Sequence, residues 1–438
     1  MFFKRKKKKK VMVVGLDGVP YSLVGRFREE GIFPNIDRIA KCTALRRMEV
    51  CVPEISAVSW PTFMTGKNPG THGIFGFMDL KPGTYKMVFP SYRDLKSPPI
   101  WEQLAQQRKR SLVINQPGTY PAAARPIEGA LVSGFVAIDM RKAISPAKHR
   151  ETLEQMGYNI DVDTGRCRED HDYLFTDLDA TLKGRQAAVD YFWKNEEWDF
   201  MEVVVTGTDR LQHFVWNAID DKDHQHHGNV MEYYRSVDAF VGGLFDRFNK
   251  ESGWDGEGQG FYMLSDHGFT QIIQEFRVNA WLKEHGYLGF KTDEPLTLED
   301  ISDDTKAFAL DPGRIFINVK GKHPRGNVDQ ADATKVIDEI IDGLSGFSYE
   351  GQPVVKKVYR REELYSGPHT AKGSDLVVLC HHGFDVKGTL KEQEVLGRTN
   401  LEGMHTQDDA FLITPTAPSD EVVHIESVAS MILETASK

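Results

Sequence analysis

Two hydrophobic patterns alternate along roughly the first 270 residues of the chain. Short apolar runs rich in β-branched residues predict buried strands at Val11–Leu16, 48–52, 111–115, 200–206 and 260–264. Longer stretches with apolar residues three and four positions apart predict helices at 21–30, 34–40, Ser56–Thr65, 100–107, 187–194, 210–217 and 230–248. Strands that alternate with helices in this way predict an α/β fold with a mainly parallel sheet between two layers of helices.

The pattern changes after residue 290. Short strand-like runs at 314–319, 353–359 and 374–379 surround one predicted helix at 331–344, which is typical of a small α+β unit. Residues 404–435 return to a strand followed by a helix. The expected organisation is therefore a polybasic disordered tip at 1–10, an α/β core at 11–290, a smaller α+β insertion at 291–400, and a return to the core at 401–438.

Charge is unevenly distributed along the chain. The formal net charge is −10, yet positions 4–10 hold seven consecutive basic residues, so the rest of the chain carries −17. An acidic body argues against broad nucleic-acid binding, which uses a basic face to neutralise phosphates. It does not argue against a small phosphorylated substrate, because bound metal ions can supply the local positive charge.

The basic tip does not introduce an export signal. The apolar run that follows, Val11–Leu16, is short and ends at Asp17, so it is neither a signal peptide nor a membrane span. The four cysteines, at 42, 51, 167 and 380, form no Cys-x-x-Cys pair, which favours reduced thiols and a cytoplasmic location. Residues 1–10 are either a solvated end or a weak contact with an anionic membrane surface, which would place the protein at the inner membrane face.

Polar side chains follow the carboxyl ends of several predicted strands. Asp17, Asp266 and His267 come directly after such strands, and Asp209 follows the strand at 200–206. Open α/β sheets bind their ligands at this edge. Asp209 and His213 are four residues apart on a predicted helix, so both side chains lie on one face, where they can hold a metal ion. Taken singly, each of these residues fits an ordinary turn or a surface pair equally well.

Considered together, the set indicates a metal centre. Three aspartates and three histidines, the third histidine being His405, provide enough ligands for two divalent ions. Mixed oxygen and nitrogen ligation without cysteine suits Zn²⁺ or Mn²⁺. Two such ions, roughly 3.5–4 Å apart in known sites, can clamp a phosphoryl group during transfer.

Residues 54–74 resemble a motif of the alkaline phosphatase superfamily. There a nucleophile opens a helix that ends near Thr-Gly, and Pro and then His-Gly-Ile follow, as in Thr65-Gly66 and His72-Gly73-Ile74. In phosphodiesterase-like members the nucleophile lies nine residues before the Thr, which is Ser56 here. The chain is most similar to the branch of type I phosphodiesterases and nucleotide pyrophosphatases that is described as predicted phosphohydrolases or phosphomutases. Segments 65–70 and 312–318 are typical of this branch.

The resemblance extends over nearly the whole chain and implies an alkaline phosphatase-like three-layer core. It also implies a role for each polar residue. One metal ion would be held by Asp209, His213 and His405, and the other by Asp17, Asp266, His267 and the oxygen of Ser56. Ser56 would also be the catalytic nucleophile. Without the resemblance, Ser56 would be read as a helix N-cap.

Two departures from related motifs bear on the substrate. Nucleotide pyrophosphatases have an asparagine three residues after the nucleophile that helps to hold the phosphate, and this position is Ser59 here. Ser59 or Asn115 could assist in substrate binding, although a structural role for Asn115 is as well supported. Sulfatases need the motif Cys-x-Pro-x-Arg or Ser-x-Pro-x-Arg. In the segment that begins at Cys51, Ile55 occupies the position of the Arg. Sulfatase chemistry is therefore not expected.

The sequence favours a metal-dependent phosphohydrolase, and among these a phosphodiesterase that acts on a small phosphodiester or nucleotide-like substrate. A phosphomutase or phosphomonoesterase would use the same site. A non-catalytic, membrane-tethered binding protein that keeps the fold is the alternative from another class. The sequence does not specify the leaving group, the metal or the oligomeric state. The insertion at 291–400 is expected to select the leaving group.

Overall fold

The computed structural model describes residues 8–419 and 422–438, and its chain forms two compact units. The first contains 1–67, 91–270 and 405–438, and the second contains 68–90 and 271–404. The expected insertion, 291–400, falls within the second unit, which also takes in the shorter segment 68–90. Of the predicted tip at 1–10, residues 1–7 lie outside the described residues.

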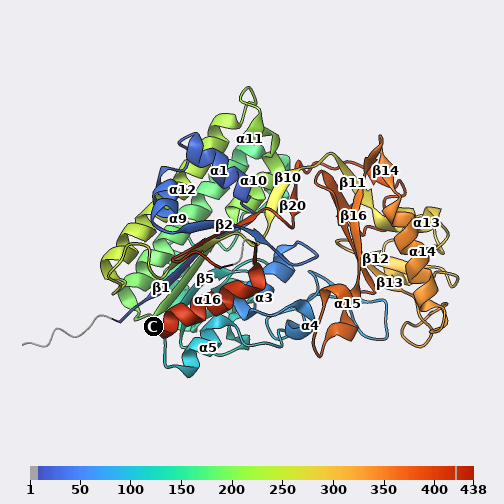
Figure 1. The fold of residues 1–438 in the computed structure, drawn as a ribbon, viewed down its shortest axis with the longest axis horizontal. Coiled ribbons are helices and arrows are strands. Elements are labelled where there is room, and N and C mark those ends of the chain that lie inside the picture. The colour runs from blue at the N-terminus through green and yellow to red at the C-terminus, as the bar shows by residue number, and fades with distance from the viewer. Residues whose placement is uncertain (1–7, 420–421) are drawn as a thin grey trace, which may run out of the picture. The chain divides into compact units, whose positions relative to one another are not determined.

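The first unit contains a nine-stranded, mainly parallel sheet (Figure 1). Its strand order is β22-β2-β21-β9-β1-β8-β5-β6-β7. At the centre, β1 (Val11–Leu16) pairs in parallel with β8 (Phe200–Val205) and β9 (Phe261–Leu264), all fully buried. The other strands are β2 (Ala44–Glu49), β5 (Ser111–Gln116), β6 (Gly129–Ser133), β7 (Ile144–Ser145), β21 (Ala410–Thr414) and β22 (Val423–His424). The predicted α/β class with a mainly parallel sheet is confirmed.

Helices cover both faces of this sheet (Figure 1). Their buried apolar sides pack on the strands or on neighbouring helices, as the sequence pattern requires. On one side lie α9 (His171–Asn195), α10 (Gly207–Val215) and α12 (His227–Glu251), with α1 (Tyr21–Glu29), α2 (Pro34–Cys42) and α11 (Asn217–Asp220) nearby. On the other side lie α3 (Ser56–Thr65), α5 (Ile100–Gln106) and α16 (Ile425–Ser437). Shorter helices are α6 (Met140–Ala143), α7 (Arg150–Gln155) and α8 (Thr164–Glu169).

Two elements differ from the sequence-based expectation. The strand expected at 48–52 is β2, at Ala44–Glu49, and it lies near the edge of the sheet, where Arg46 and Arg47 are tolerated because they are only partly buried or exposed. The helix expected at 187–194 is the last third of α9. Gly184 and many charged residues mask the helical pattern of α9, although one side of the helix is buried along its whole length.

Gly15 allows the helix that begins at Ser56 to approach the central strand closely. A Cβ atom at Gly15 would lie 2.6 Å from the Trp60 ring. The indole therefore packs directly on β1, and its Nε1–H donates to Asp17 Oδ2 at 3.3 Å. This contact ties α3 to the carboxyl end of β1, which sets the position of Ser56 relative to Asp17.

The second unit has its own hydrophobic core. A four-stranded antiparallel sheet is formed by β12 (Ala307–Leu310), β13 (Arg314–Ile317), β17 (Leu376–Cys380) and β16 (Val355–Arg360). Helices α13 (Val278–Glu284) and α14 (Ala333–Ser345) pack on it. Smaller elements are α4 (Pro69–His72), β3 (Asp79–Leu80), β4 (Met87–Val88), β11 (Gln274–Arg277), β14 (Ser348–Tyr349), β15 (Gln352–Pro353), α15 (Arg361–Leu364), β18 (Phe384–Lys387) and β19 (Leu396–Gly397).

Two further observations concern the membrane and the cysteines. Among the helices of 8–419 and 422–438, none combines the length and the hydrophobicity that a bilayer crossing requires. Cys42, Cys51, Cys167 and Cys380 are not joined in disulfides.

Glu202 is an ionisable residue in the middle of the central sheet. It lies on β8 opposite Val13 of β1 and Val113 of β5, its side chain is fully buried, and neither carboxyl oxygen has a hydrogen-bond partner. Burial raises the pKa of Glu202 from 4.5 to about 8. The folded protein therefore holds this proton at pH values where the unfolded chain has released it.

We expect Glu202 to make the protein less stable as the pH rises from about 4.5 to about 8, because the folded state binds more protons than the unfolded state in this range. The Glu202→Gln variant should lose this dependence. Between pH 4.5 and pH 8 its free energy of unfolding should rise, relative to that of the wild type, by up to roughly 4 kcal/mol. Denaturant unfolding at several pH values measures the difference. The exposed Glu169→Gln exchange is the control, and parallel curves for wild type and Glu202→Gln would contradict the prediction.

Candidate metal centre

The chain brings six of the expected ligands together at the carboxyl ends of the central strands. Asp17 follows β1, Asp266 and His267 follow β9, and Asp209 and His213 lie on α10 directly after β8. His405 lies on β20 (Gly403–Thr406), which pairs with β10 (Gly268–Gln271) just beyond His267. Parallel strands place their following residues at one edge of a sheet, and this edge is where distant parts of the chain meet.

The first group of ligands surrounds one oxygen of Asp209. Asp209 Oδ1 lies 3.2 Å from His405 Nε2, 3.4 Å from His213 Nε2 and 3.9 Å from His267 Nε2. The two nitrogens of His213 and His405 are 3.0 Å apart. Asp209, His267 and His405 offer ligand atoms within 4.8 Å of one another. His213 is close to two of these atoms, as its spacing from Asp209 on one helix predicts.

The second group consists of Asp17, Asp266 and His267. His267 Nε2 lies 3.4 Å from Asp266 Oδ2 and 3.6 Å from Asp17 Oδ1. All three residues are buried. The two groups adjoin through His267, so a single compact cluster of carboxylates and imidazoles could hold two ions side by side.

Backbone carbonyl groups fix the orientation of two of the histidines. His405 Nδ1 lies 2.9 Å from the carbonyl oxygen of Glu54, and His267 Nδ1 lies 3.0 Å from that of Gly268. A carbonyl oxygen only accepts, so in each ring Nδ1 carries the hydrogen. Burial lowers the pKa of His267 to about 4, which keeps its ring neutral, and its Nε2 lone pair therefore faces the carboxylates. Metal-binding histidines show this arrangement.

The electrostatics of the cluster fit bound cations. Asp209 Oδ1 and Asp266 Oδ2 are buried without a hydrogen-bond partner. Burial and the neighbouring carboxylates raise the pKa of Asp17 well above its ordinary range, and burial raises that of Asp266 to about 7. Two carboxylate oxygens without a hydrogen-bond donor and the Nε2 lone pair of His267 thus converge on one place. The donor set of three carboxylates and three imidazoles suits divalent ions of the zinc or manganese type.

Ser56 lies at the edge of this cluster. It is the first residue of α3, and its side chain is buried. Ser56 Oγ lies 3.1 Å from His267 Nε2 and 3.4 Å from Asp17 Oδ1. The first N–H groups of a helix have no partner within the helix, and they attract an anion together with the helix dipole. A hydroxyl group, a metal-ligand cluster and a helix N-terminus therefore meet at one place.

The two tentative substrate-binding residues differ in their surroundings. Ser59 lies one turn after Ser56 on α3, is fully buried, and has its Oγ 3.2 Å from Cys51 Sγ. Asn115 is also fully buried; its Nδ2–H donates to the carbonyl of Val204 at 3.1 Å, and its Oδ1 accepts from Tyr158 at 3.3 Å. Both ends of the Asn115 side chain are thus used inside the fold, which fits the structural role that the sequence left open.

No sequence pattern indicated the residue that orients Asp209. Arg210 is partly buried, its Nη1 donates to Asp209 Oδ2 at 3.1 Å, and its Nη2 donates to Asp161 Oδ2 at 2.7 Å. Asp209 Oδ2 is thereby occupied, and Oδ1 is left to face the histidines. Together with His213 and His405, Arg210 holds the pKa of Asp209 below its ordinary range although burial opposes this.

Two further contacts fix the turn after β1. Thr208 Oγ1 donates to the carbonyl of Asp17 at 2.6 Å, and the backbone N–H of Gly18 donates to Asp266 Oδ1 at 3.2 Å. Gly18 has φ of +71°, a conformation that glycine adopts without strain. The turn is therefore joined to Asp266 and to Thr208, the residue that precedes Asp209. The sequence identified Asp17 and Asp266 as candidate ligands, but not the contacts of Thr208 and Gly18 that fix the turn.

Comparison with known families agrees with this arrangement. The family model of type I phosphodiesterases and nucleotide pyrophosphatases matches residues 11–408, which include every residue of the cluster. The chain belongs to the type I phosphodiesterase/nucleotide pyrophosphatase family. This family is part of the alkaline phosphatase superfamily, as the motif at 54–74 predicts. No curated protein sequence matches the chain.

Solved structures share the fold of this family member at low sequence identity. Phosphonoacetate hydrolase from Sinorhizobium meliloti 1021, in complex with phosphonoformate, aligns with a TM-score of 0.65 at 14% identity, over 98% of this chain and 96% of that one. Murine ectonucleotide pyrophosphatase/phosphodiesterase 5 aligns with a TM-score of 0.56 at 14% identity, over 98% of this chain and 95% of that one. The alkaline phosphatase PafA aligns with a TM-score of 0.59 at 14% identity, over 99% of this chain and 97% of that one. The alkaline phosphatase-like fold is thus confirmed.

Proposed function

We propose that this protein is a metal-dependent phosphohydrolase, and specifically a phosphodiesterase, that uses Ser56 as its nucleophile. The observation that carries the proposal is the orientation of His267 and His405. Both rings donate Nδ1–H to a backbone carbonyl and turn Nε2 toward buried carboxylates, beside the Ser56 hydroxyl. Such an arrangement is unfavourable unless a cation lies between the nitrogen and oxygen atoms.

The residues divide between two ions. Asp209, His213 and His405 would hold one, and Asp17, Asp266, His267 and the Ser56 oxygen would hold the other, with His267 close enough to Asp209 to adjoin both. Two divalent ions, zinc or manganese, supply a lowered pKa for the Ser56 hydroxyl, charge neutralisation for the phosphoryl oxygens and stabilisation of the leaving oxygen.

The chemistry on Ser56 proceeds in two displacements. The Ser56 hydroxyl releases its proton to solvent, and Oγ attacks phosphorus while the bond from phosphorus to the ester oxygen breaks. The alcohol leaves with a proton taken from solvent, and Ser56 carries the phosphoryl group. Water then attacks phosphorus from the side that the alcohol vacated, the Oγ–phosphorus bond breaks, and Ser56 takes a proton back. The balance is one diester and one water consumed for one monoester and one alcohol.

The fold prepares Ser56 for this reaction. The N-terminus of α3 presents N–H groups to the phosphoryl oxygens, and these donors are fixed before the substrate arrives. Trp60, one turn after Ser56, holds Asp17 through its indole N–H and keeps α3 against β1. Arg210 keeps Oδ1 of Asp209 directed toward the histidines.

Ligands of structurally similar proteins support a small phosphorylated substrate. Phosphonoacetate hydrolase has been solved with phosphonoacetate, and an inactive variant of murine ectonucleotide pyrophosphatase/phosphodiesterase 5 with AMP. For this chain we propose a small phosphodiester or a nucleotide-like compound. Ser59 stands where nucleotide pyrophosphatases have a phosphate-binding asparagine, so we expect the hydroxyl of Ser59 to make a weaker contact at this position.

A substrate comparison tests the proposal. Protein reconstituted with Zn²⁺, Mn²⁺ or Mg²⁺ is assayed on bis-(p-nitrophenyl) phosphate and on p-nitrophenyl phosphate, followed by nucleotides, sugar phosphates and phospholipid head groups. We expect kcat/KM for the diester to exceed that for the monoester by roughly tenfold or more. A preference for the monoester, or phosphoryl transfer between sugar phosphates without hydrolysis, would exclude the phosphodiesterase. Absence of both bound metal and turnover would indicate a binding protein.

A further inference from the structure

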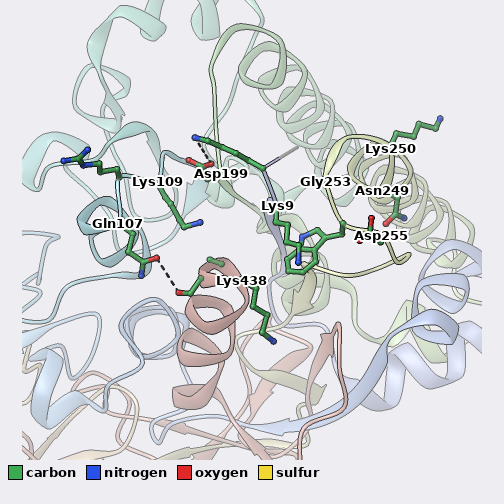
Figure 2. A pocket seen from close by; sticks show the side chains of 14 residues that line it. Lys9, Gln107, Lys109, Asp199, Asn249, Lys250, Gly253, Asp255 and Lys438 are labelled. Carbon is green, nitrogen blue, oxygen red and sulfur yellow. Dashed lines mark hydrogen bonds and ion pairs between the residues drawn. The ribbon is translucent and has the colours of Figure 1, made fainter. Parts of the chain in front are cut away.

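A polar cavity lies at the end of the central sheet opposite the metal centre. It measures about 1080 Å³ and is formed entirely by residues of the first unit (Figure 2). Its walls come from the residues just before β1, β5 and β8, from the end of α12 with the loop that follows it, and from the end of α16. Six cationic side chains line it: Lys8, Lys9, Arg108, Lys109, Lys250 and Lys438. We refer to these six as the basic basal surface.

Acidic residues compensate part of this charge, and one of them, Glu434, lies outside the lining, with its Oε1 3.5 Å from Lys438 Nζ. The cavity contains two, Asp199 and Asp255, so cations exceed acids by four. Asp199 is only 8% exposed and is already engaged, because its Oδ2 accepts the backbone N–H of Arg110 at 2.9 Å and its Oδ1 lies 3.7 Å from Lys8 Nζ. A concentrated positive surface therefore stands on a protein whose formal net charge is −10.

The basic basal surface is continuous in sequence with the basic tip. Lys8 and Lys9 line the cavity, and positions 4–7, which lie outside the described residues, are all Lys or Arg. Clusters of four to eight basic residues attract anionic lipid head groups, with about 1 kcal/mol for each Lys or Arg near the surface. Five of the six cavity cations are lysines, which are flexible point charges and suit a fluid array of head groups better than a fixed bidentate ligand.

Among the described residues that line the cavity one is aromatic, Trp254, and it is already engaged. Trp254 donates Nε1–H to the carbonyl of Lys10 at 2.7 Å, and Lys9 Nζ lies 4.3 Å from the ring centroid. The ring is thus poorly placed for stacking with a base, which single-stranded nucleic acids require. A membrane makes contact with one end of the protein only, so acidic residues elsewhere on the protein do not repel it. The same acidic residues would repel a polyanion that wraps around the protein.

We propose that the basic basal surface docks the protein on a membrane rich in anionic phospholipid. Lys8, Lys9 and Lys109 lie before the first residues of β1 and β5, whereas the metal-centre residues follow the last residues of β1, β8 and β9. Docking and the proposed hydrolysis thus use opposite ends of the sheet. The docking proposal stands independently of the identity of the substrate.

Vesicle co-sedimentation of the whole chain tests the proposal. We expect binding to phosphatidylcholine vesicles that contain about a third phosphatidylglycerol, and little to phosphatidylcholine alone. Lys109→Gln with Lys250→Gln should weaken binding roughly 10- to 30-fold although the tip is intact. The matched control is Lys183→Gln with Lys222→Gln, which removes the same charge from exposed lysines of the same unit that do not line the cavity. Thermal unfolding and diesterase activity should be unchanged in both variants.

Three results would overturn the proposal. Equal losses in the cavity and control variants would show that only net charge matters. Loss of vesicle binding on addition of inorganic phosphate, at constant ionic strength, would assign the cavity to a free phosphate group. Tighter binding to a labelled single-stranded RNA than to the vesicles, with the same sensitivity to Lys109 and Lys250, would assign it to nucleic acid.

Discussion

Replacing Ser56 by alanine should lower kcat/KM for a phosphodiester by at least roughly 10³-fold, because the variant lacks the oxygen that attacks phosphorus. Ser56 Oγ is the hydroxyl that contacts both His267 Nε2 and Asp17 Oδ1. Steady-state kinetics on the metal-loaded variant measures the loss. Rapid acid quenching of the wild type should capture the phosphoryl group on Ser56, which mass spectrometry can locate.

The Ser59→Ala exchange is the matched control for this experiment. Ser59 lies three residues later on the same helix, is equally buried, and has its hydroxyl directed at Cys51. We expect it to raise KM by roughly tenfold or less and to leave the phosphorylated enzyme detectable. At saturating metal concentration the metal content should remain at the wild-type value in both variants, because Asp17, Asp266 and His267 are unchanged. Comparable losses for Ser56→Ala and Ser59→Ala, or unchanged turnover of Ser56→Ala, would remove Ser56 from the reaction.

Replacing Asp17 by asparagine should change stability in opposite directions with and without metal. Asp17 shares a buried cluster with Asp209 and Asp266, so the metal-free protein is destabilised by repulsion between carboxylates that the exchange reduces. Divalent ions should raise the unfolding temperature of the wild type by roughly 5 °C at a hundredfold excess over the dissociation constant. The metal-free variant should have a higher unfolding temperature than the metal-free wild type, and metal ions should raise it little. The variant should also lose most of its turnover.

Thermal unfolding with and without Zn²⁺ or Mn²⁺ measures both effects, and elemental analysis gives the metal content. Asp179→Asn, an exposed aspartate on α9 in the same unit, controls for the loss of one negative charge. A metal-dependent increase of the same size in wild type and Asp17→Asn would mean that Asp17 is not a ligand. A lower unfolding temperature of the metal-free variant would mean that the carboxylates are not in conflict.

Local signals specified much of the first unit. α3 begins and ends where expected, at Ser56 and Thr65, because an apolar segment is followed by Gly66, whose φ of +64° closes the helix. The central strands were recognisable because strands buried on both faces are apolar throughout. The amino-acid sequence alone therefore places the polar residues that follow them at one edge of the sheet.

The remaining features depend on contacts between distant parts of the chain. His405 is oriented by the carbonyl of Glu54, which lies 351 positions away. Asp209 is oriented by Arg210, and Arg210 in turn is held by Asp161, which lies 49 positions from it. Segment 68–90 joins the second unit partly through the hydrogen bond from Tyr85 to Asn318, 233 positions away. No hydrophobic period or short motif encodes such pairs, because each depends on the completed fold.

The opposed positions of the basic basal surface and the metal centre also affect how a substrate arrives. β1 and β8 each contain six residues and therefore separate the two ends by about 20 Å. At physiological ionic strength a surface potential decays with a Debye length of about 8 Å, so over two such lengths separate the bilayer from Ser56. A negatively charged membrane repels phosphate esters from the layer of solution beside it. A docked molecule would hold its nucleophile beyond that layer and would meet its substrate at the concentration of the bulk solution.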